Sequence, residues 1–140
     1  MSIQSVTSRL SGQQGRFLLQ ARDQHLVVDA SEARGGQGQA WQAAELLLGA
    51  LTTCSNAVIT EQARLDDVLL TGLSIHASCD PDPDKPGHYR FIELDYLFSD
   101  VNQELAEKWV NQFKQVCPIY GSLSRGAPVH ITVRTQSSAS

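Results

Sequence analysis

The sequence has few positively charged residues and no basic cluster. Its 140 residues include 11 Lys and Arg against 15 Asp and Glu, which gives a formal net charge of −4. Proteins that bind nucleic acid or an anionic membrane surface gather basic side chains on one face, because the phosphate groups they contact are negative. The sequence therefore predicts neither nucleic acid nor a membrane as a partner.

Long hydrophobic runs are also missing. No stretch reaches the roughly 18 consecutive apolar residues that a membrane-spanning helix needs. Residues 1–7 contain no basic start followed by an apolar run, as a secretory signal would. We therefore expect a cytoplasmic protein. A hydrophobic share of 41% and a charged share of 19% are those of an ordinary soluble protein, so residues 1–134 are expected to form one domain. The polar residues 135–140 are expected to be a disordered tail.

Cysteine is scarce, and its placement is informative. Three cysteines are too few, and odd in number, for a disulfide scaffold, so in a reducing compartment they start as free thiols. Cys54 ends the most apolar segment, Glu45-Leu-Leu-Leu-Gly-Ala-Leu-Thr-Thr-Cys54, and Cys117 opens the turn Cys117-Pro-Ile-Tyr-Gly-Ser. Cys79 is in phase with the apolar residues of a predicted strand, which predicts a core position for it.

No pattern indicates a metal or cofactor site. The 4 histidines lie in different predicted elements, without the short His or Cys spacings of zinc sites. The acidic residues of Asp80 to Asp84 lack the glycine and distal glutamate of a calcium loop. The glycines of Gly35 to Gly38 lack the full spacing of a dinucleotide-binding motif. We therefore expect neither metal nor cofactor.

Periodicity predicts the order of the elements. Alternating apolar residues predict strands at 2–10, 17–21, 25–29, 73–79, 92–98 and 129–133. Helical patterns cover 42–64, a stretch between Asp100 and Cys117, and a short segment from Pro118 to about Ser124. Asp100 and Gln103 are expected to cap the middle helix. Leucines cover most of the circumference of the first helix, which predicts a homodimer that encloses it.

The two outer cysteines suggest redox chemistry. A thiol reacts as its thiolate, which a nearby positive charge or a helix N-terminus stabilises. Cys54 lies in the middle of a helix and needs an arginine from elsewhere, with Arg34 and Arg22 as the candidates. Cys117 lies where the short helix begins, so backbone amides there would favour its thiolate. If the two sulfurs meet, they act as attacker and resolver.

Two other interpretations of these cysteines stay open at this point. Free cysteine is among the most buried residue types, so Cys54 and Cys117 can both be small hydrophobic core residues. A papain-like site would instead pair Cys54 with His25 or His130, although no local signature supports it.

Three segments together resemble the OsmC/Ohr family of thiol-dependent hydroperoxide reductases. They are the loop Gly35 to Gly38, the segment from Glu45 to Cys54, and Val116-Cys-Pro-Ile-Tyr-Gly-Ser-Leu123 before a closing strand. The resemblance runs from about His25 to Val133. It implies an α+β, OsmC-like fold with antiparallel sheets around a long central helix, in an intertwined homodimer with active sites at the subunit interface.

The resemblance also implies a reaction and its residues. Cys54 would be the peroxidatic cysteine and Cys117 the resolving one, with Arg34 close to the peroxidatic sulfur and oriented by Glu45. In Ohr-like members the arginine comes from the early strands, which points to Arg22. An organic hydroperoxide would be reduced to the alcohol through a Cys54 sulfenic acid and a Cys54–Cys117 disulfide, and an external thiol would reset the enzyme.

Apolar residues near the two cysteines predict the type of peroxide, and one segment departs from the family pattern. Apolar side chains that would favour a hydrophobic peroxide, each equally explained as core, are Trp41, Leu51, Ile119 and Tyr120. Typical members carry Pro-Glu before the apolar run, whereas this chain has Ala43-Ala44-Glu45. That difference favours the alternative of a divergent, non-catalytic OsmC-like protein that binds a small apolar or thiol ligand at the dimer interface.

Overall fold

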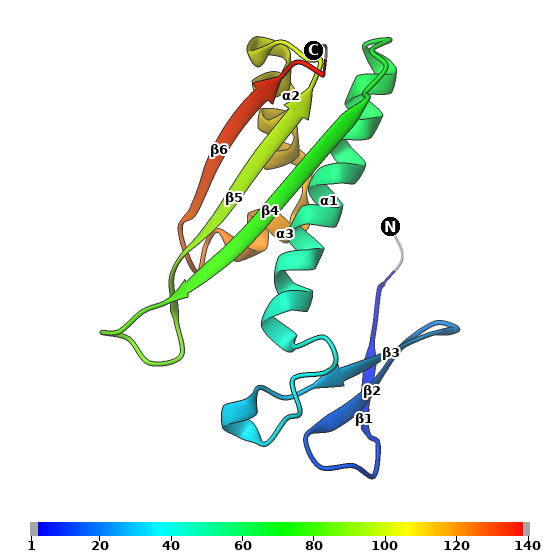
Figure 1. Ribbon diagram of the computed structural model, residues 1–140, viewed down its shortest axis with the longest axis vertical. Coiled ribbons are helices and arrows are strands. Elements are labelled where there is room, and N and C mark those ends of the chain that lie inside the picture. Colours follow the sequence, from blue (N-terminus) through cyan, green and yellow to red (C-terminus); the bar gives the residue numbers. More distant parts are fainter. Residues whose placement is uncertain (1–2, 139–140) are drawn as a thin grey trace. The chain divides into compact units, whose positions relative to one another are not determined.

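The structure is a computed structural model that describes residues 3–138 (Figure 1). The chain forms two compact units, Met1–Leu47 and Leu48–Ser140, and each is described by itself. The long helix α1 (Ala43–Leu65) begins in the first unit and continues through the second.

The first unit is a three-stranded antiparallel sheet in the order β1-β2-β3. Its strands are β1 (Thr7–Leu10), β2 (Arg16–Ala21) and β3 (Gln24–Asp29), followed by the short 3-10 helix η1 (Glu32–Arg34). Arg22 has a φ of 55° in the tight turn between β2 and β3, a left-handed conformation that two-residue hairpin turns require. β1 begins later than predicted, at Thr7, because its pairing with β2 starts there. Ser2 lies outside the described residues.

The second unit contains one sheet and the helices α1, α2 and α3. The strands are β4 (Gly72–Pro81), β5 (Tyr89–Ser99) and β6 (Val129–Gln136), in the order β4-β5-β6. The helices after the β4–β5 hairpin are α2 (Gln103–Val116) and α3 (Pro118–Leu123). All of these elements occur in the predicted order.

β6 corrects the expectation of antiparallel sheets. β4 and β5 are antiparallel, but β6 pairs with β5 in parallel, with Ile92 opposite Val129. A parallel pair needs a crossover connection, and here α2 and α3 form it (Figure 1). They return the chain to the end of the sheet at which β5 begins, so that β6 starts beside the start of β5. The second sheet is therefore mixed.

The core of the second unit lies on one face of its sheet. Alternate residues of β5 are almost completely buried, namely Ile92, Leu94, Tyr96 and Phe98. Because side chains alternate across a strand, all four point to the same face. Trp109 and Phe113 of α2 and Leu51 and Ile59 of α1 belong to the same cluster, and each buried apolar side chain of this size contributes about 1.5–3 kcal/mol.

Only one stripe of α1 is fully buried by its own chain. Its buried residues are Leu51, Ser55, Ile59 and Ala63, spaced four apart. By length and composition the helix is apolar enough to span a membrane, and 17% of its most apolar 18-residue stretch is buried. A helix in the core of a folded protein can have the same composition and length. The predicted enclosure of this helix on nearly every side is therefore not met within one chain.

The predicted cap of α2 is wrong by two residues. Asn102 is the N-cap, and its side-chain oxygen accepts a hydrogen bond of 2.8 Å from the amide of Leu105. Asp100 has a φ of 60° and binds elsewhere, accepting from the amide of Ser138 at 2.9 Å and from the hydroxyl of Thr71 at 3.0 Å.

The same contacts correct the predicted disordered tail. Thr135 and Gln136 pair with the end of β5, and Ser138 is held by Asp100. Order therefore extends through residue 138, because strand pairing continues past the last apolar residue of β6. The rest of the predicted tail, residues 139–140, lies outside the described residues.

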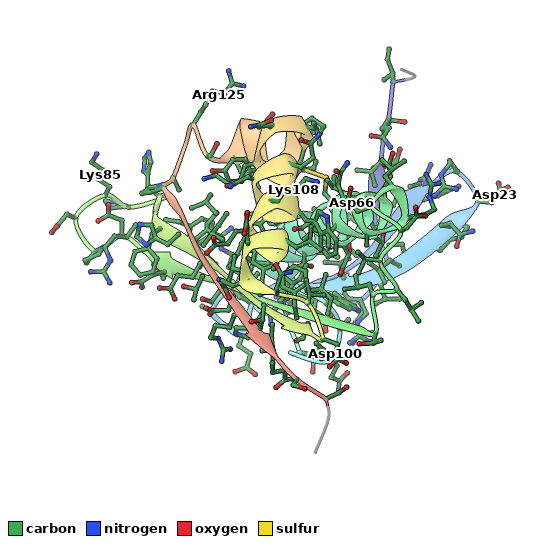
Figure 2. All side chains as sticks on the ribbon, turned by 90° about the horizontal axis from the view of Figure 1, so that it is seen from above. Asp23, Asp66, Lys85, Asp100, Lys108 and Arg125 are labelled. Atoms are coloured by element: carbon green, nitrogen blue, oxygen red, sulfur yellow. A yellow bond between two sulfur atoms is a disulfide. The ribbon has the colours of Figure 1, made fainter. Side chains whose placement is uncertain are left out.

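A polar contact fastens the end of α1 to α2. The Asp66 carboxylate accepts from the Trp109 indole at 2.8 Å and from the Lys108 ammonium at 3.1 Å (Figure 2). The bond from Trp109, aided by Lys108, lowers the pKa of Asp66. Cys54 lies on α1, and Cys117 directly follows α2, so this contact helps to hold together the segments that carry the two cysteines.

Candidate redox site

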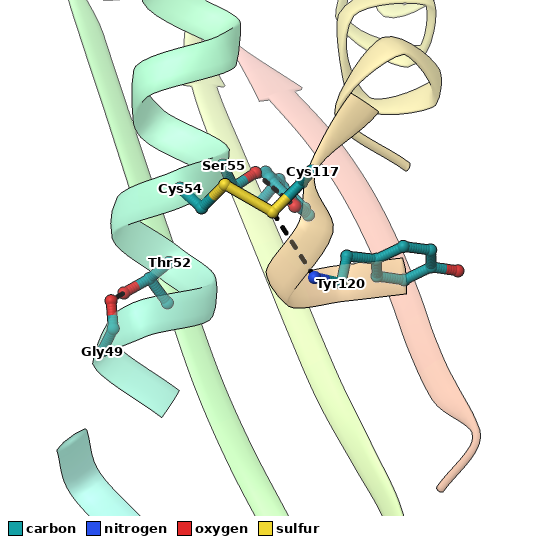
Figure 3. Close-up of a disulfide and its surroundings, with 7 residues drawn as sticks. Gly49, Thr52, Cys54, Ser55, Cys117 and Tyr120 are labelled. Atoms are coloured by element: carbon teal, nitrogen blue, oxygen red, sulfur yellow. Dashed lines mark hydrogen bonds between the residues drawn. A yellow bond between two sulfur atoms is a disulfide. The ribbon is translucent and has the colours of Figure 1, made fainter. Parts of the chain in front are cut away.

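Cys54 and Cys117 form a disulfide in the second unit (Figure 3). Cys54 lies in the middle of α1, and Cys117 lies between α2 and α3. Their Cα atoms are 6.6 Å apart, within the range that a disulfide spans without backbone movement. The fold therefore brings together the two cysteines that the sequence separates by 63 positions.

Pro118 fixes the position of Cys117. A proline disfavours helical geometry in the residue before it, and its own φ suits the first position of a helix. Cys117 therefore ends α2, donating its amide to the carbonyl of Phe113 at 3.0 Å, and also begins α3. Its sulfur accepts a hydrogen bond from the amide of Tyr120 at 3.4 Å. The sequence predicted this placement at the start of the short helix.

A buried hydrogen bond holds the helix turn that carries Cys54. The hydroxyls of Ser55 and Tyr96 are 2.6 Å apart and both residues are fully buried. Burial raises the pKa of Tyr96 to about 12, against the opposing effect of the Ser55 hydrogen bond. Sequence analysis missed this pair. The only feature of the sequence that could have indicated the pair is Ser55, a polar residue on the same helix face as Leu51 and Ile59.

The predicted substrate-binding residues of the second unit differ in exposure. Leu51 is fully buried in the core, Tyr120 is half-buried, and Ile119 is 37% exposed. The Tyr120 ring packs against Phe113 at a centroid distance of 5.4 Å. Ile119 and Tyr120 lie in α3, which begins directly after Cys117. The substrate-binding role of all three residues stays a prediction.

The remaining predicted site residues lie in the first unit. Arg34 is the last residue of η1, Arg22 lies in the β2–β3 turn, and both are exposed. Trp41 is exposed and its carbonyl accepts from the amide of Asp29 at 2.8 Å. Glu45 accepts from the amide of Gln42 at 2.9 Å, which caps the start of α1. Their assignment to the site stays a prediction.

A buried carboxylate organises the loop around Arg34. Asp29 is 1% exposed and accepts from two nitrogens of Arg16 at 2.7 and 3.0 Å, and from the amides of Gln39 and Ala40 at 3.0 and 2.9 Å. The Arg16 hydrogen bonds hold the pKa of Asp29 well below its usual range, although burial opposes this. Sequence analysis missed this ion pair, because nothing in the spacing of the two residues indicated it.

Gly36 of the same loop, and Gly15 in the turn before β2 that packs against this loop, allow close packing of the backbone. A Cβ atom on Gly36 would lie 1.6 Å from the carbonyl oxygen of Ala30, and one on Gly15 would lie 2.3 Å from that of Gly35. Only glycine allows the backbone to approach this closely. The loop therefore has a structural reason for glycine that involves no ligand.

Cys79 lies on β4 and packs against the core, as predicted. Burial, together with the neighbouring Cys79 sulfur, raises the pKa of Tyr89. Across residues 3–138, no group of three His, Cys, Asp or Glu side chains is placed to hold a metal ion.

Comparison with known proteins identifies relatives of this architecture. A family model described as OsmC-like protein matches residues 36–132. No curated protein matched the sequence. A hypothetical protein from Aquifex aeolicus VF5 has a similar structure, with a TM-score of 0.84, 16% identity and 98% of each chain covered.

Two further solved structures are similar over nearly their whole length. An OsmC-like protein from Mycoplasma pneumoniae has a TM-score of 0.81 at 13% identity, covering 96% of this chain and 97% of the other. An organic hydroperoxide resistance protein OsmC from Legionella pneumophila has a TM-score of 0.75 at 20% identity, covering 96% and 98%. These structures share the α+β fold with its two small sheets and central helix.

Proposed function

Because the chain belongs to the family of OsmC-like proteins, we propose that it is a thiol-dependent peroxidase that reduces organic hydroperoxides to alcohols. The structurally similar Legionella protein is described as an organic hydroperoxide resistance protein, which supports this class of substrate. The observation that carries the proposal is the Cys54–Cys117 disulfide, because it pairs an attacking sulfur with a resolving one.

The proposed reaction has three balanced steps. The Cys54 thiolate attacks one peroxide oxygen, the O–O bond breaks, and the alkoxide leaves and takes up a proton to become the alcohol. The sulfur, oxidised by two electrons, is then a sulfenic acid. The Cys117 thiol attacks this sulfur, forming the disulfide and releasing water. Two equivalents of an external thiol reduce the disulfide and become a disulfide themselves.

We propose Arg34 as the positive group beside Cys54. A guanidinium stabilises both the thiolate and the charge that develops on the leaving oxygen. Arg34→Ala should slow peroxide consumption at least about tenfold, given the strength of hydrogen bonds to charged groups. Arg22→Ala is the matched control, and it should change the rate less. If Arg22→Ala slowed peroxide consumption more than Arg34→Ala, the role would belong to Arg22.

We propose a homodimer in which a second copy covers α1. The support is that only 17% of the most apolar part of α1 is buried by its own chain, and that residues 46–50 of this helix are only half-buried. Apolar surface that a chain leaves uncovered is commonly covered by a partner. Light scattering should give about twice the chain mass of 15.3 kDa. A stable monomer at micromolar concentration would contradict the dimer.

One observation favours a second candidate function, a non-catalytic protein that binds a small apolar or thiol ligand. The Glu45 carboxylate caps its own helix through the amide of Gln42, and Ala44 occupies the position where typical members carry an acid. Without a carboxylate to orient it, an arginine near Cys54 would be less well placed for catalysis.

Peroxide consumption separates the two functions. Reduced protein is mixed with cumene hydroperoxide, and both peroxide loss and thiol loss are followed. We expect Cys54→Ser to abolish consumption, and Cys117→Ser to consume one equivalent without forming an intrachain disulfide. Cys79→Ser is the control and should behave as wild type. No consumption by wild type, or equal consumption by Cys54→Ser, would favour the binding protein.

A further inference from the structure

The two sulfurs of the disulfide have different surroundings. Cys117 is 3% exposed, and its sulfur accepts the amide hydrogen bond from Tyr120. Cys54 is only half-buried, and its neighbours Thr53 and Asn56 on α1 are exposed. Among residues 48–138, no hydrogen bond reaches the Cys54 sulfur. The disulfide therefore has one accessible end and one stabilised end.

Both differences bear on how a thiol would reduce this bond. In thiol–disulfide exchange, the attacking thiolate forms a bond to one sulfur while the other leaves as a thiolate. Exchange is faster when the attacked sulfur is accessible and when the departing thiolate is stabilised. Access selects Cys54 for attack, and the Tyr120 amide selects Cys117 for departure.

We propose that the external thiol attacks the sulfur of Cys54, and that Cys117 is the sulfur that leaves. The reductant thiolate forms a mixed disulfide with Cys54 while the Cys54–Cys117 bond breaks, and its electron pair goes to Cys117. A second thiolate then attacks the reductant sulfur of the mixed disulfide and releases the Cys54 thiolate. The proposal rests on the proposed function only for the thiol nature of the reductant.

The amide of Tyr120 is free to serve this role because of its place in α3. The first amide of this short helix to bond within the helix is that of Gly121, which donates to the carbonyl of Cys117 at 2.9 Å. The Tyr120 amide comes one residue earlier, so its hydrogen bond to the sulfur competes with no backbone bond. It is in place before the disulfide opens.

Two effects of the proposed function bear on this direction of attack. An arginine beside Cys54 would stabilise Cys54 as a leaving group and so oppose it, but a nucleophile must first reach the opposite sulfur, and Cys117 is buried. A second copy packed on α1 would narrow the approach to Cys54 without opening one to Cys117. The accessibility of the two sulfurs therefore determines that the reductant attacks Cys54.

The site of attack can be mapped directly in Cys79→Ser protein, which keeps only the two sulfurs in question. The disulfide is formed with diamide, so the result does not depend on peroxide chemistry. The protein is treated briefly with glutathione, quenched with acid, and its free thiols are blocked with N-ethylmaleimide. Peptide mass spectrometry should find glutathione on Cys54 and maleimide on Cys117. Glutathione on Cys117, or equal labelling, would overturn the proposal.

A kinetic comparison decides the matter if the mixed disulfide does not accumulate. Tyr120→Pro removes both the amide donor and the ring, whereas Tyr120→Ala removes the ring alone. Glutathione should reduce the proline variant roughly 3- to 10-fold more slowly than the alanine variant, given the strength of a hydrogen bond to a developing thiolate. Equal rates in two folded variants would overturn the role of the amide. Failure of the peroxidase assay leaves both of these measurements unaffected.

Discussion

Ser55 and Tyr96 form a polar pair inside an apolar core. With both hydroxyls present each has a partner at 2.6 Å, and removing one leaves the other buried without it. A buried polar group left without a partner destabilises a protein by about 1–3 kcal/mol. Ser55→Ala and Tyr96→Phe should therefore each lower the free energy of unfolding in urea by about that amount.

The double variant distinguishes a lost hydrogen bond from lost packing. Because it leaves no unpaired hydroxyl, Ser55→Ala with Tyr96→Phe should be less destabilised than the sum of the two single variants. Simple additivity would show that the pair contributes nothing as a pair. Thr60→Ala, at an exposed position of the same helix, is the control for helix effects.

Asp29 makes the first unit sensitive to acid. Its pKa in the folded protein lies below the value in the unfolded chain, because of the Arg16 hydrogen bonds. The unfolded state therefore binds the proton first, and the stabilisation is complete above about pH 4 and lost as the pH falls further. Asp29→Asn should be less stable at pH 7 and should lose less stability between pH 7 and pH 3, as measured by circular dichroism.

The matched control for this prediction is Asp23→Asn. Asp23 is exposed in the β2–β3 turn (Figure 2). This variant should keep the acid sensitivity of wild type. An Asp29→Asn variant with the pH dependence of wild type would show that another group controls acid unfolding.

At the scale of single residues, the sequence indicated residues whose own chemistry is unusual, such as cysteines. It did not indicate residues whose importance depends on a hydrogen-bond partner elsewhere in the chain. Cys54 and Cys117 stood out through their positions in an apolar helix and before a proline. Ser55 and Asp29 gave little signal, because their importance comes from Tyr96 and Arg16, which only the fold brings near.

At the scale of elements, the loop after β3 depends on the absence of a side chain at Gly36. Gly36→Ala would place a methyl group 1.6 Å from the carbonyl oxygen of Ala30, and both are backbone-fixed. We expect the variant to lose about 1–3 kcal/mol of stability, as overpacked sites do. Gly121→Ala in α3, where nothing lies within 4 Å, is the control. It should be neutral or slightly stabilising.

Thermal unfolding measures both glycine variants in the same way. A Gly36→Ala protein as stable as Gly121→Ala would mean that the loop relaxes without loss. In that case the close approach would have no part in holding the loop that carries Arg34.

The elements themselves were largely predictable, and their pairing was not. Apolar periodicity gave α1, α2 and the strands to within a few residues, except at the start of β1, because burial of one face imposes that period. The cap of α2 was misplaced because Asp100 binds Ser138, which lies far along the chain. The parallel direction of β6 has no local signature, since parallel and antiparallel strands share the same alternation.

At the scale of the whole molecule, the disulfide links stability to redox state. It closes a loop with a sequence separation of 63, which restricts the unfolded chain. Such a crosslink typically stabilises a protein by about 2–4 kcal/mol. Oxidised wild type should therefore unfold at a higher urea concentration than reduced wild type. A variant with both Cys54→Ser and Cys117→Ser should not respond to reductant, and a Cys79→Ser variant should respond fully.

Identical unfolding midpoints for oxidised and reduced wild type would contradict this link. Intact mass before each measurement establishes the oxidation state, so that an incomplete reaction is not mistaken for an absent effect.

The parallel pairing of β5 with β6 has a consequence for the order of folding. β4 and β5 form a hairpin and can pair as soon as both are synthesised, whereas β6 is synthesised only after α2 and α3. Pairing that must wait for a crossover is slow, because the intervening chain has to be ordered first. Until β6 arrives, one edge of β5 offers its backbone groups to any other strand. A nascent or truncated chain that ends before Val129 should therefore associate with other chains more readily than the 140-residue chain.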